Sequence, residues 1–269
     1  MKIGFKKKAK SAAEEEPMLH VAGETHVGLI REVNEDSFCY IAYPEELNSL
    51  AVVADGIGGH QSGDVASAIC CEHFICAWKK SDAGNFSADF MAGHFMTKTT
   101  TEANTLIYDE NCRRQLPQPM GTTIVAAIFT PQSIIVGHSG DSRLYILRNG
   151  LLQRLTEDHS YVAELVRRKI ITENEAAGHP FSHIISRSLG PAAEVEPEVN
   201  IFPRLPTDRF ILCSDGLTTH LSEKRIEEIL LYSKTPREAL DMFMKDTLIS
   251  GGEDNVTVIC IFSTLGALN

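Results

Sequence analysis

The sequence predicts an α+β fold in which two antiparallel sheets pack together and helices cover their outer sides. Segments typical of strands and of helices come in blocks rather than in strict alternation. Turns too short for a crossover join consecutive strands, which indicates antiparallel pairing. The 269 residues can bury one substantial core, and no proline-rich or serine-rich linker interrupts the interior. We therefore expect a single domain over residues 19–264.

The first block of elements consists of three strands and two helices. Strand-like runs at 19–25, 37–42 and 50–54 are separated by Gly, Asn, Glu and Pro residues. Helical spacing follows at 63–79 and 88–112. We expect the apolar residues that recur at this spacing to face the core: Val65, Ile69 and Cys76 in the first helix, and Phe90, Met91, Phe95 and Leu106 in the second.

The second block is rich in strands, and the last third of the chain is mixed. Strands are predicted at 122–129, 133–137, 143–147 and 150–154, with a strong hairpin signal at Arg148-Asn149-Gly150. The polar section 156–198 contains helical pieces, including one at 161–168. A strand at 209–213, helices at 223–231 and 235–249, and a final strand at 255–262 complete the pattern.

Charge and composition exclude several classes of protein. The formal net charge of -11 argues against a nucleic-acid partner, and no segment approaches the roughly 20 apolar residues that span a bilayer. Residues 1–18 are polar and lack the apolar stretch of a signal peptide, so we expect a disordered, solvated tail in preference to a membrane contact. The expected location is the cytoplasm, and a monomer is expected.

The seven cysteines indicate reduced, buried thiols. They are odd in number, lie mostly in apolar stretches and never form Cys-x-x-Cys. No cysteine is followed six positions later by arginine, so the phosphate-binding loop of cysteine-dependent phosphatases is missing.

Four acidic motifs carry the functional signal, each where an extended apolar segment begins or ends. An isolated acid at a strand end is usually a turn former, and spacing alone does not show that these motifs converge. If they converge, the repulsion between carboxylates requires a cation, and oxygen ligands select hard ions such as Mg²⁺ or Mn²⁺. The motifs are Arg31-Glu32-Val33-Asn34-Glu35-Asp36, Ala54-Asp55-Gly56-Ile57-Gly58-Gly59-His60, Ser214-Asp215-Gly216 and Asp254-Asn255-Val256-Thr257-Val258.

The order of these motifs, with Gly140-Asp141-Ser142-Arg143 between the second and third, resembles the metal-dependent protein phosphatases of the protein phosphatase 2C family. The form Asp-Gly-x-Gly-Gly-His resembles the bacterial branch. The resemblance runs from about residue 20 to residue 262. It implies a four-layer α-β-β-α sandwich of two antiparallel sheets flanked by helices, and a serine/threonine protein phosphatase that uses Mn²⁺ or Mg²⁺.

The resemblance also implies the metal ligands. Asp55 matches the carboxylate that bridges two tightly bound ions, and Gly56 offers its carbonyl. Asp215 and Asp254 match the other ligands of one ion, while Glu35 matches the acid that holds the second through water. The last two positions have competing interpretations: Asp36 matches an adjoining acid or is a turn residue, and Asp141 matches a ligand of a weaker third ion or forms an Asx turn.

The implied reaction is attack of a water shared by the two metals on the phosphorus, without a phosphoenzyme intermediate. Arg31 is expected to bind the phosphate oxygens, and we prefer this interpretation to a surface ion pair with Glu32 or Glu35. Ile57 stands where eukaryotic relatives carry the histidine proposed as the acid. His60 is the nearest replacement, although it is equally compatible with capping the glycine turn.

Other residues are given structural roles. His73, His94, His159, His179 and His183 are expected on the surface or in the core rather than as ligands, and the section from 159 to 197 corresponds to the flap of the family. Expected partners are serine/threonine-phosphorylated proteins and, from the bacterial form of the motifs, an opposing serine/threonine kinase. Two alternatives remain: an inactive relative that binds phosphoproteins, and a two-metal nuclease or phosphodiesterase, which the acidic charge disfavours.

Overall fold

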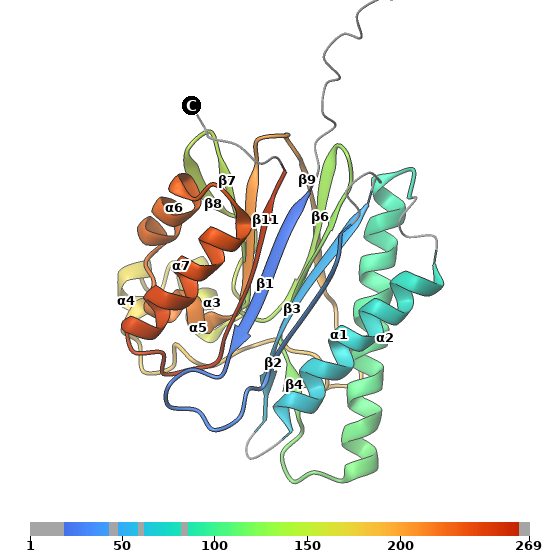
Figure 1. Cartoon of the computed structure of the whole chain (residues 1–269). Coiled ribbons are helices and arrows are strands. Elements are labelled where there is room, and N and C mark those ends of the chain that lie inside the picture. The colour runs from blue at the N-terminus through green and yellow to red at the C-terminus, as the bar shows by residue number, and fades with distance from the viewer. Residues whose placement is uncertain (1–18, 43–47, 59–61, 82–85, 264–269) are drawn as a thin grey trace, which may run out of the picture.

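The molecule is a sandwich of two antiparallel sheets with helices on both outer faces (Figure 1). The computed structural model describes residues 19–42, 48–58, 62–81 and 86–263. The predicted α+β, four-layer architecture is confirmed. The polar N-terminal tail predicted at 1–18 lies outside the described residues.

One sheet is assembled from both ends of the chain. Its strand order is β1-β11-β10-β7-β8, so the first strand pairs with the last. The strands are β1 (His20–His26), β7 (Arg143–Arg148), β8 (Leu151–Arg154), β10 (Arg209–Cys213) and β11 (Val256–Phe262). The predicted hairpin at 148–150 joins β7 to β8, with Asn149 and Gly150 both at positive φ.

The second sheet has the order β2-β3-β5-β6-β9, with the short β4 paired to β3. Its strands are β2 (Asp36–Ile41), β3 (Ser49–Ile57), β4 (Gly121–Thr122), β5 (Ile124–Phe129), β6 (Ser133–Ser139) and β9 (Glu198–Pro203). The single strand predicted at 122–129 is divided at Thr123, whose N–H donates to the Asp55 carbonyl instead of continuing one ladder.

Three apolar layers hold the sandwich together. In β3, Leu50, Val52 and Ala54 face α1 (Gly63–Lys80) and α2 (Asp89–Arg114), whereas Ala51 and Val53 point between the sheets. This alternation follows from the period of two along a strand. Each sheet is therefore covered on both faces, and inner strands such as β5, β10 and β11 are buried along their whole length.

The third layer lies under the C-terminal helices, on the other outer face. These are α5 (Asp215–His220), α6 (Glu223–Tyr232) and α7 (Pro236–Ile249). Thr235 begins α7 by accepting the N–H of Glu238, and Pro236 occupies the first turn. Leu240 and Phe243 of α7 are completely buried against the sheet that contains β1 and β11.

The prediction of which apolar residues of the second helix face the core is wrong in part. Phe95 is buried, but Phe90, Met91 and Leu106 are exposed. The buried face mixes large apolar residues with small and polar ones, among them two asparagines that bind a neighbouring loop. Asn104 donates to the carbonyls of Ala192 and Ala193, and Asn111 donates to the Gly190 carbonyl.

Cysteine burial also differs from the prediction. All seven thiols are free, as expected, but Cys76 and Cys112 are exposed on α1 and α2. The apolar stretches that contain them are amphipathic helices with a solvent side, so an apolar neighbourhood in sequence does not ensure burial. No helix among the described residues is long and apolar enough to cross a membrane.

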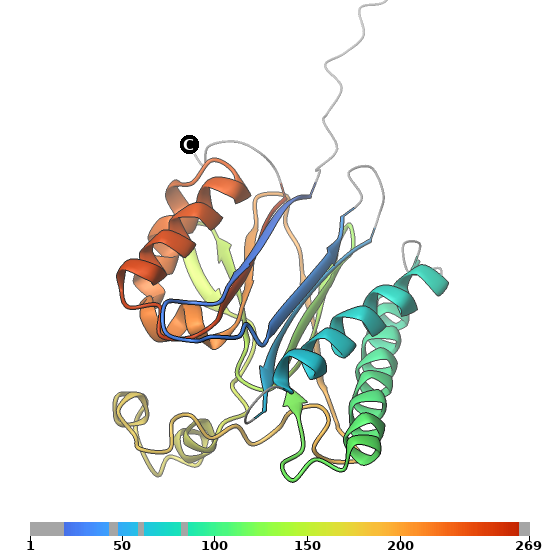
Figure 2. The same cartoon turned by 60° about the horizontal axis from the view of Figure 1, so that its bottom comes forward.

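The section between β8 and β9 stands apart from the two outer helical layers, as the yellow segment in Figure 2 shows. It contains α3 (Tyr161–Arg167) and α4 (Glu173–Ala177), and we call residues 156–197 the flap. Thr172 and Glu175 form a reciprocal capping box at the start of α4. Sequence patterning missed β9, because its side chains are half-exposed and it ends at Pro203.

Phe243→Ala should lower the free energy of unfolding by about 3–5 kcal/mol, because it removes a fully buried ring and leaves a cavity. Phe90→Ala is the matched control: the same substitution at a ring that is 74% exposed should change stability by less than about 0.5 kcal/mol. Urea denaturation of both variants checks this, and equal losses would show that Phe90 packs in the core.

Candidate functional site

The acidic motifs meet at one end of the sandwich, and each sheet contributes to them. Asp36 and Asp55 are direct partners in the register of β2 and β3. Asp215 begins α5 after β10, and Asp254 precedes β11 in the other sheet. Chain segments separated by more than 200 positions are therefore brought together by the packing of the two sheets.

Asp55 lies at the centre of this group of carboxylates. Burial raises the pKa of its carboxyl well above the usual range. The nearby carboxylates of Asp36, Asp215 and Asp141 raise this pKa further. Burial and the charge of Asp254 likewise raise the pKa of Asp215. The group thus has more negative charge than the fold itself compensates.

Asp36 is held by hydroxyl groups. Its Oδ2 accepts hydrogen bonds from Ser214 Oγ and Thr257 Oγ1, both at 2.7 Å, while its buried Oδ1 has no hydrogen-bond partner. Burial raises the Asp36 pKa to about 7 despite these two bonds. Asp36 therefore links β2 to β10 and β11 behind the site, a position that fits a supporting acid better than a simple turn residue.

Gly56 and Glu35 lie against the start of α1. The Gly56 N–H donates to the Glu35 carbonyl at 3.1 Å, and a Cβ on Gly56 would sit 2.5 Å from that oxygen. Glu35 Oε1 accepts from the Gly63 N–H at 3.2 Å, and burial raises the Glu35 pKa. Only a residue without a side chain fits between these backbones.

Arg31 pairs with Asp254 rather than with Glu32 or Glu35. Its Nη2 donates to Asp254 Oδ2 at 2.9 Å, and its side chain is 51% exposed. An exposed ion pair of this kind contributes little to stability, so the guanidinium can exchange partners at low cost. The Asp254 charge is the largest cause of the raised Arg31 pKa.

Asp141 projects from the tight turn that follows β6. Gly140 has φ +117°, and a Cβ there would meet the Thr123 side chain at 2.6 Å. Ser142 Oγ lies 2.7 Å from Thr123 Oγ1, which fixes the turn against β5. Asp141 Oδ1 is buried without a partner, and burial together with Asp215 and Asp158 raises its pKa to about 7.

These donors fit hard divalent cations. Every potential ligand atom is an oxygen, three buried aspartate oxygens lack hydrogen-bond partners, and the carboxylates repel each other. Arg143 does not neutralise them directly, because its guanidinium binds both oxygens of Asp158. His60 lies outside the described residues, so its assignment as an acid stays a prediction.

Two residues that shape the site received no role from the sequence: Asn255, which lies within a motif, and Asp64, which lies outside the motifs. Asn255 donates to the carbonyls of Val27 and Val33 and accepts the Glu35 N–H, so it holds the loop that carries Arg31. Asp64, at the start of α1, has a buried Oδ1 without a partner, and its charge raises the Glu35 pKa. The position of Asn255 directly after Asp254 was the only feature of the sequence that could have indicated its role.

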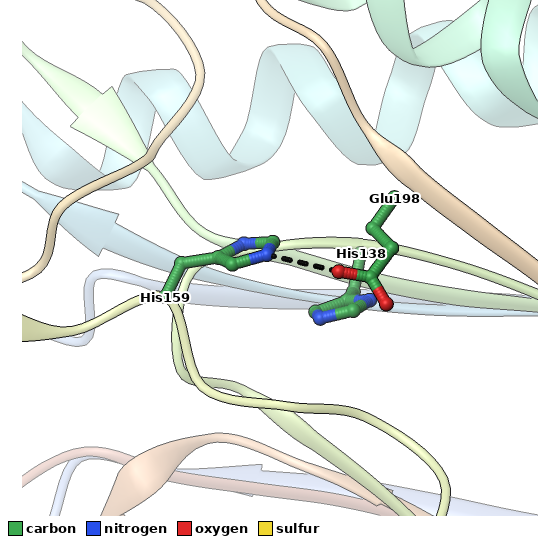
Figure 3. Close-up of side chains that lie close together, drawn as sticks. All are labelled: His138, His159 and Glu198. Carbon is green, nitrogen blue, oxygen red and sulfur yellow. Dashed lines mark hydrogen bonds and ion pairs between the residues drawn. The ribbon is translucent and has the colours of Figure 1, made fainter. Parts of the chain in front are cut away.

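Among the described residues, the side chains whose potential ligand atoms lie within 4.8 Å of one another are a different set: His138, His159 and Glu198 (Figure 3). His138, which received no role from the sequence, and His159, which was expected on the surface or in the core, are both buried, and Glu198 is partly exposed. This set lies at the base of the flap, on β6, before α3 and at the start of β9.

Comparison with known proteins identifies the family. A family profile described as Protein phosphatase 2C matches residues 28–248. The chain belongs to the protein phosphatase 2C family. The serine/threonine phosphatase stp of Listeria monocytogenes serotype 4b (strain F2365) is 37% identical over 245 residues, covering 90% of this chain and 95% of that protein. The resemblance drawn from the motifs is thereby confirmed.

Solved structures of this protein phosphatase 2C family share the sandwich. The Mycobacterium tuberculosis phosphatase PstP/Ppp has a TM-score of 0.82 at 33% identity, covering 91% of this chain and 98% of that one. The S. agalactiae serine/threonine phosphatase has a TM-score of 0.84 at 33% identity, covering 91% and 99%. A structure of the PstP catalytic domain is described as a complex with two manganese ions; its TM-score is 0.78 at 33% identity, covering 91% and 98%.

Asp141→Asn should raise the melting temperature of the chelator-treated protein at pH 8 by about 5 °C, because the fold disfavours the ionised carboxylate. A carboxyl whose folded pKa is raised contributes stability below its unfolded pKa, near 4, and loses it as the pH rises through about 7. The difference between variant and wild type should therefore grow from about pH 4 to pH 7 and then level off. Thermal melts in EDTA measure it; a constant difference would contradict the raised pKa.

Proposed function

We propose that this protein hydrolyses phosphoserine and phosphothreonine in proteins, using Mn²⁺ or Mg²⁺ and no phosphoenzyme intermediate. Membership of the protein phosphatase 2C family and the serine/threonine phosphatases among the relatives support the reaction. The observation that carries the proposal is the concentration of charge around Asp55, whose pKa is raised by burial and by three other aspartates. Such a group needs cations to be ionised at neutral pH.

The proposed ligands follow the positions of the carboxylates. Asp55, at the centre, would be a ligand of both tightly held ions, and Gly56 would contribute its carbonyl oxygen. Asp215 and Asp254, from the other sheet, would hold one of these ions, and Glu35 would hold the second through water. Asp141 would hold a third, weaker ion. The PstP structure with two manganese ions is consistent with two tight sites.

The protein's residues and the metals divide the chemistry between them. Divalent ions supply a low-pKa water and neutralise the charge that builds on the transferred phosphoryl group. Arg31 binds the phosphate oxygens through its planar guanidinium and leaves Asp254 free to bind metal, since the exposed pair separates easily. Asp36 orients the neighbouring segments through Ser214 and Thr257.

The alternatives are less well supported. An inactive phosphoprotein-binding relative would be expected to lack metal carboxylates, yet Glu35, Asp55, Asp215 and Asp254 are all present. A nuclease would have to bind a polyanion with a chain of net charge -11. We propose a cytoplasmic monomer that opposes a serine/threonine kinase.

Asp55→Asn should lower the turnover of a phosphoseryl peptide by about 10³-fold or more, because a bridging ligand loses its charge but keeps its volume. In the wild type, EDTA should abolish phosphate release, Mn²⁺ should restore it, and Mn²⁺ should raise the melting temperature. Asp55→Asn should lose this thermal shift.

Asp109→Asn, an identical substitution at an exposed position of α2, is the matched control and should behave as wild type. Full turnover by wild-type protein shown to be metal-free would disprove the metal mechanism. Peptide binding without phosphate release would instead support the inactive relative.

Phe181→Ala should lower activity on protein substrates more than activity on small substrates. The exposed flap residues Tyr161 and Phe181 form an aromatic cluster with the half-buried His179. The ring centroids are 5.6–6.3 Å apart, and the cluster is suited to contacting a polypeptide. We expect kcat/KM for a phosphoprotein to fall about tenfold and that for an aryl phosphate to change less than about twofold. Phe90→Ala, on α2, should affect neither; equal losses on both substrates would show that the flap supports the metal site.

A further inference from the structure

The loop that carries Arg31 also presents a group of apolar side chains to solvent, and the reaction described above gives them no role. Leu29, Ile30 and Val33 are 60%, 70% and 44% exposed, and we call these three residues the apolar cluster. Single exposed apolar residues are normal in folded proteins, whereas an apolar cluster bordered by charged residues is typical of a binding surface. The border here includes Arg31 and Glu32, which are both exposed.

Backbone contacts hold the apolar cluster in place, so its exposure does not come from a loose loop. The Leu29 N–H donates to the Gly252 carbonyl at 2.7 Å. The Asn255 side chain donates to the carbonyls of Val27 and Val33 at 2.9 and 3.0 Å, one at each end of the loop. The apolar side chains are therefore held out toward solvent by the same contacts that position Arg31.

The apolar cluster lies beside the group that we propose to bind phosphate. Arg31 Nη2 donates to Asp254 Oδ2 at 2.9 Å. A Cβ on Gly252 would lie 3.3 Å from Leu29 Cγ, so the Leu29 side chain covers the turn that leads to Asp254. In Figure 2 this blue loop between β1 and β2 runs beside the end of α7. Leu29 and Ile30 are thus within two positions of Arg31, on a segment that packs against the metal-binding end of the other loop.

A phosphorylated residue bound by Arg31 would bring its neighbours in the substrate chain to this surface. Consecutive Cα atoms are about 3.8 Å apart, so residues one or two positions away lie within about 7 Å of the phosphorylated residue. Glu32 and Glu253 are exposed in the same two loops, next to Arg31 and Asp254. These charges repel an acidic neighbour in the substrate, whereas an apolar neighbour can cover the apolar cluster.

We propose that Leu29 and Ile30 form a subsite for an apolar side chain within two residues of the phosphorylated serine or threonine. Substrates selected in this way have an apolar flank and no acidic residue beside the phosphorylated position. The inference rests on the proposed phosphatase function and on phosphate binding by Arg31. Because the subsite contacts the substrate away from the reacting atoms, it determines KM and selectivity rather than kcat.

The test uses substitutions that differ in how much apolar surface they leave. Leu29→Ser and Ile30→Ser each remove an apolar side chain, whereas Ile30→Val keeps a smaller one of the same kind. Leu151→Ser is the matched control, because Leu151 is 62% exposed on β8, at the opposite edge of the sheet from β1. Melting temperatures show whether each variant is folded.

The substrates are phosphothreonyl peptides with serine at the two positions on each side of the phosphothreonine, and leucine or aspartate then replaces one serine at a time. With Mn²⁺, leucine at the best position should raise the wild-type kcat/KM about five- to tenfold over serine, mainly through KM, because part of an apolar side chain is buried. Aspartate should raise kcat/KM at none of these positions.

The ratio of kcat/KM for the leucine peptide to that for the serine peptide is the decisive quantity, because a general loss of activity cancels in it. This ratio should fall to about twofold or less in Leu29→Ser and Ile30→Ser, and should stay near the wild-type value in Ile30→Val and Leu151→Ser. Fluorescence anisotropy with phosphonate analogues of the same peptides measures binding without turnover, and the affinity ratio should change in the same way.

Wild-type protein that releases phosphate neither from these peptides nor from an aryl phosphate would reject the phosphatase function, and the inference with it. If the wild type is active but does not distinguish leucine from serine, the subsite is disproved while the function stands. A preference that survives in both Leu29→Ser and Ile30→Ser, or that is lost in Phe181→Ala instead, would place the apolar side chain elsewhere. A concentration-dependent dimer that Ile30→Ser dissociates would also overturn the inference, because it would assign the apolar cluster to a second copy of the chain.

Discussion

Repulsion among carboxylates crowded at one end of the sandwich is the constraint on which the rest of the site depends. Asp55 is surrounded by acids that raise its pKa. Apart from the exposed pair of Arg31 with Asp254, the contacts that hold these acids come from neutral groups. Hydroxyls from Ser214 and Thr257 hold Asp36, and Asn255 holds the loop of Glu35 and Arg31. This scaffold keeps the acids in place while leaving their charge available to a cation.

The clustered acids are divided between two sheets that pack together mainly through apolar side chains. Asp36 and Asp55 belong to one sheet, and Asp215 and Asp254 lie near the ends of strands in the other. The close-packed layer between them, which includes Val53, Phe210 and Ile259, sets their relative position. Because dense packing resists sliding, core residues far from the site determine the distance between these acids.

Much of the fold was predictable, because the alternation of apolar residues and the hairpin at Asn149-Gly150 are local signals. The faces of α2 were not, since Asn104 and Asn111 are buried by contacts with a loop about 80 positions away, which leave Phe90 in solvent. For the site, the motifs named the acids only through family resemblance; spacing does not show convergence. The hydrogen bonds of Asn255 and His159 are made to backbone groups that become neighbours only after folding.

The pairing of β1 with β11 has a consequence for synthesis of the protein. β11 is an inner strand of its sheet, between β1 and β10, and Asp254 lies two residues before it. A nascent chain made only as far as α7 therefore carries β1 without its partner strand. Synthesis of the next segment brings Asp254 into the cluster of acids and supplies the strand that pairs with β1, so the sheet and the cluster are completed together.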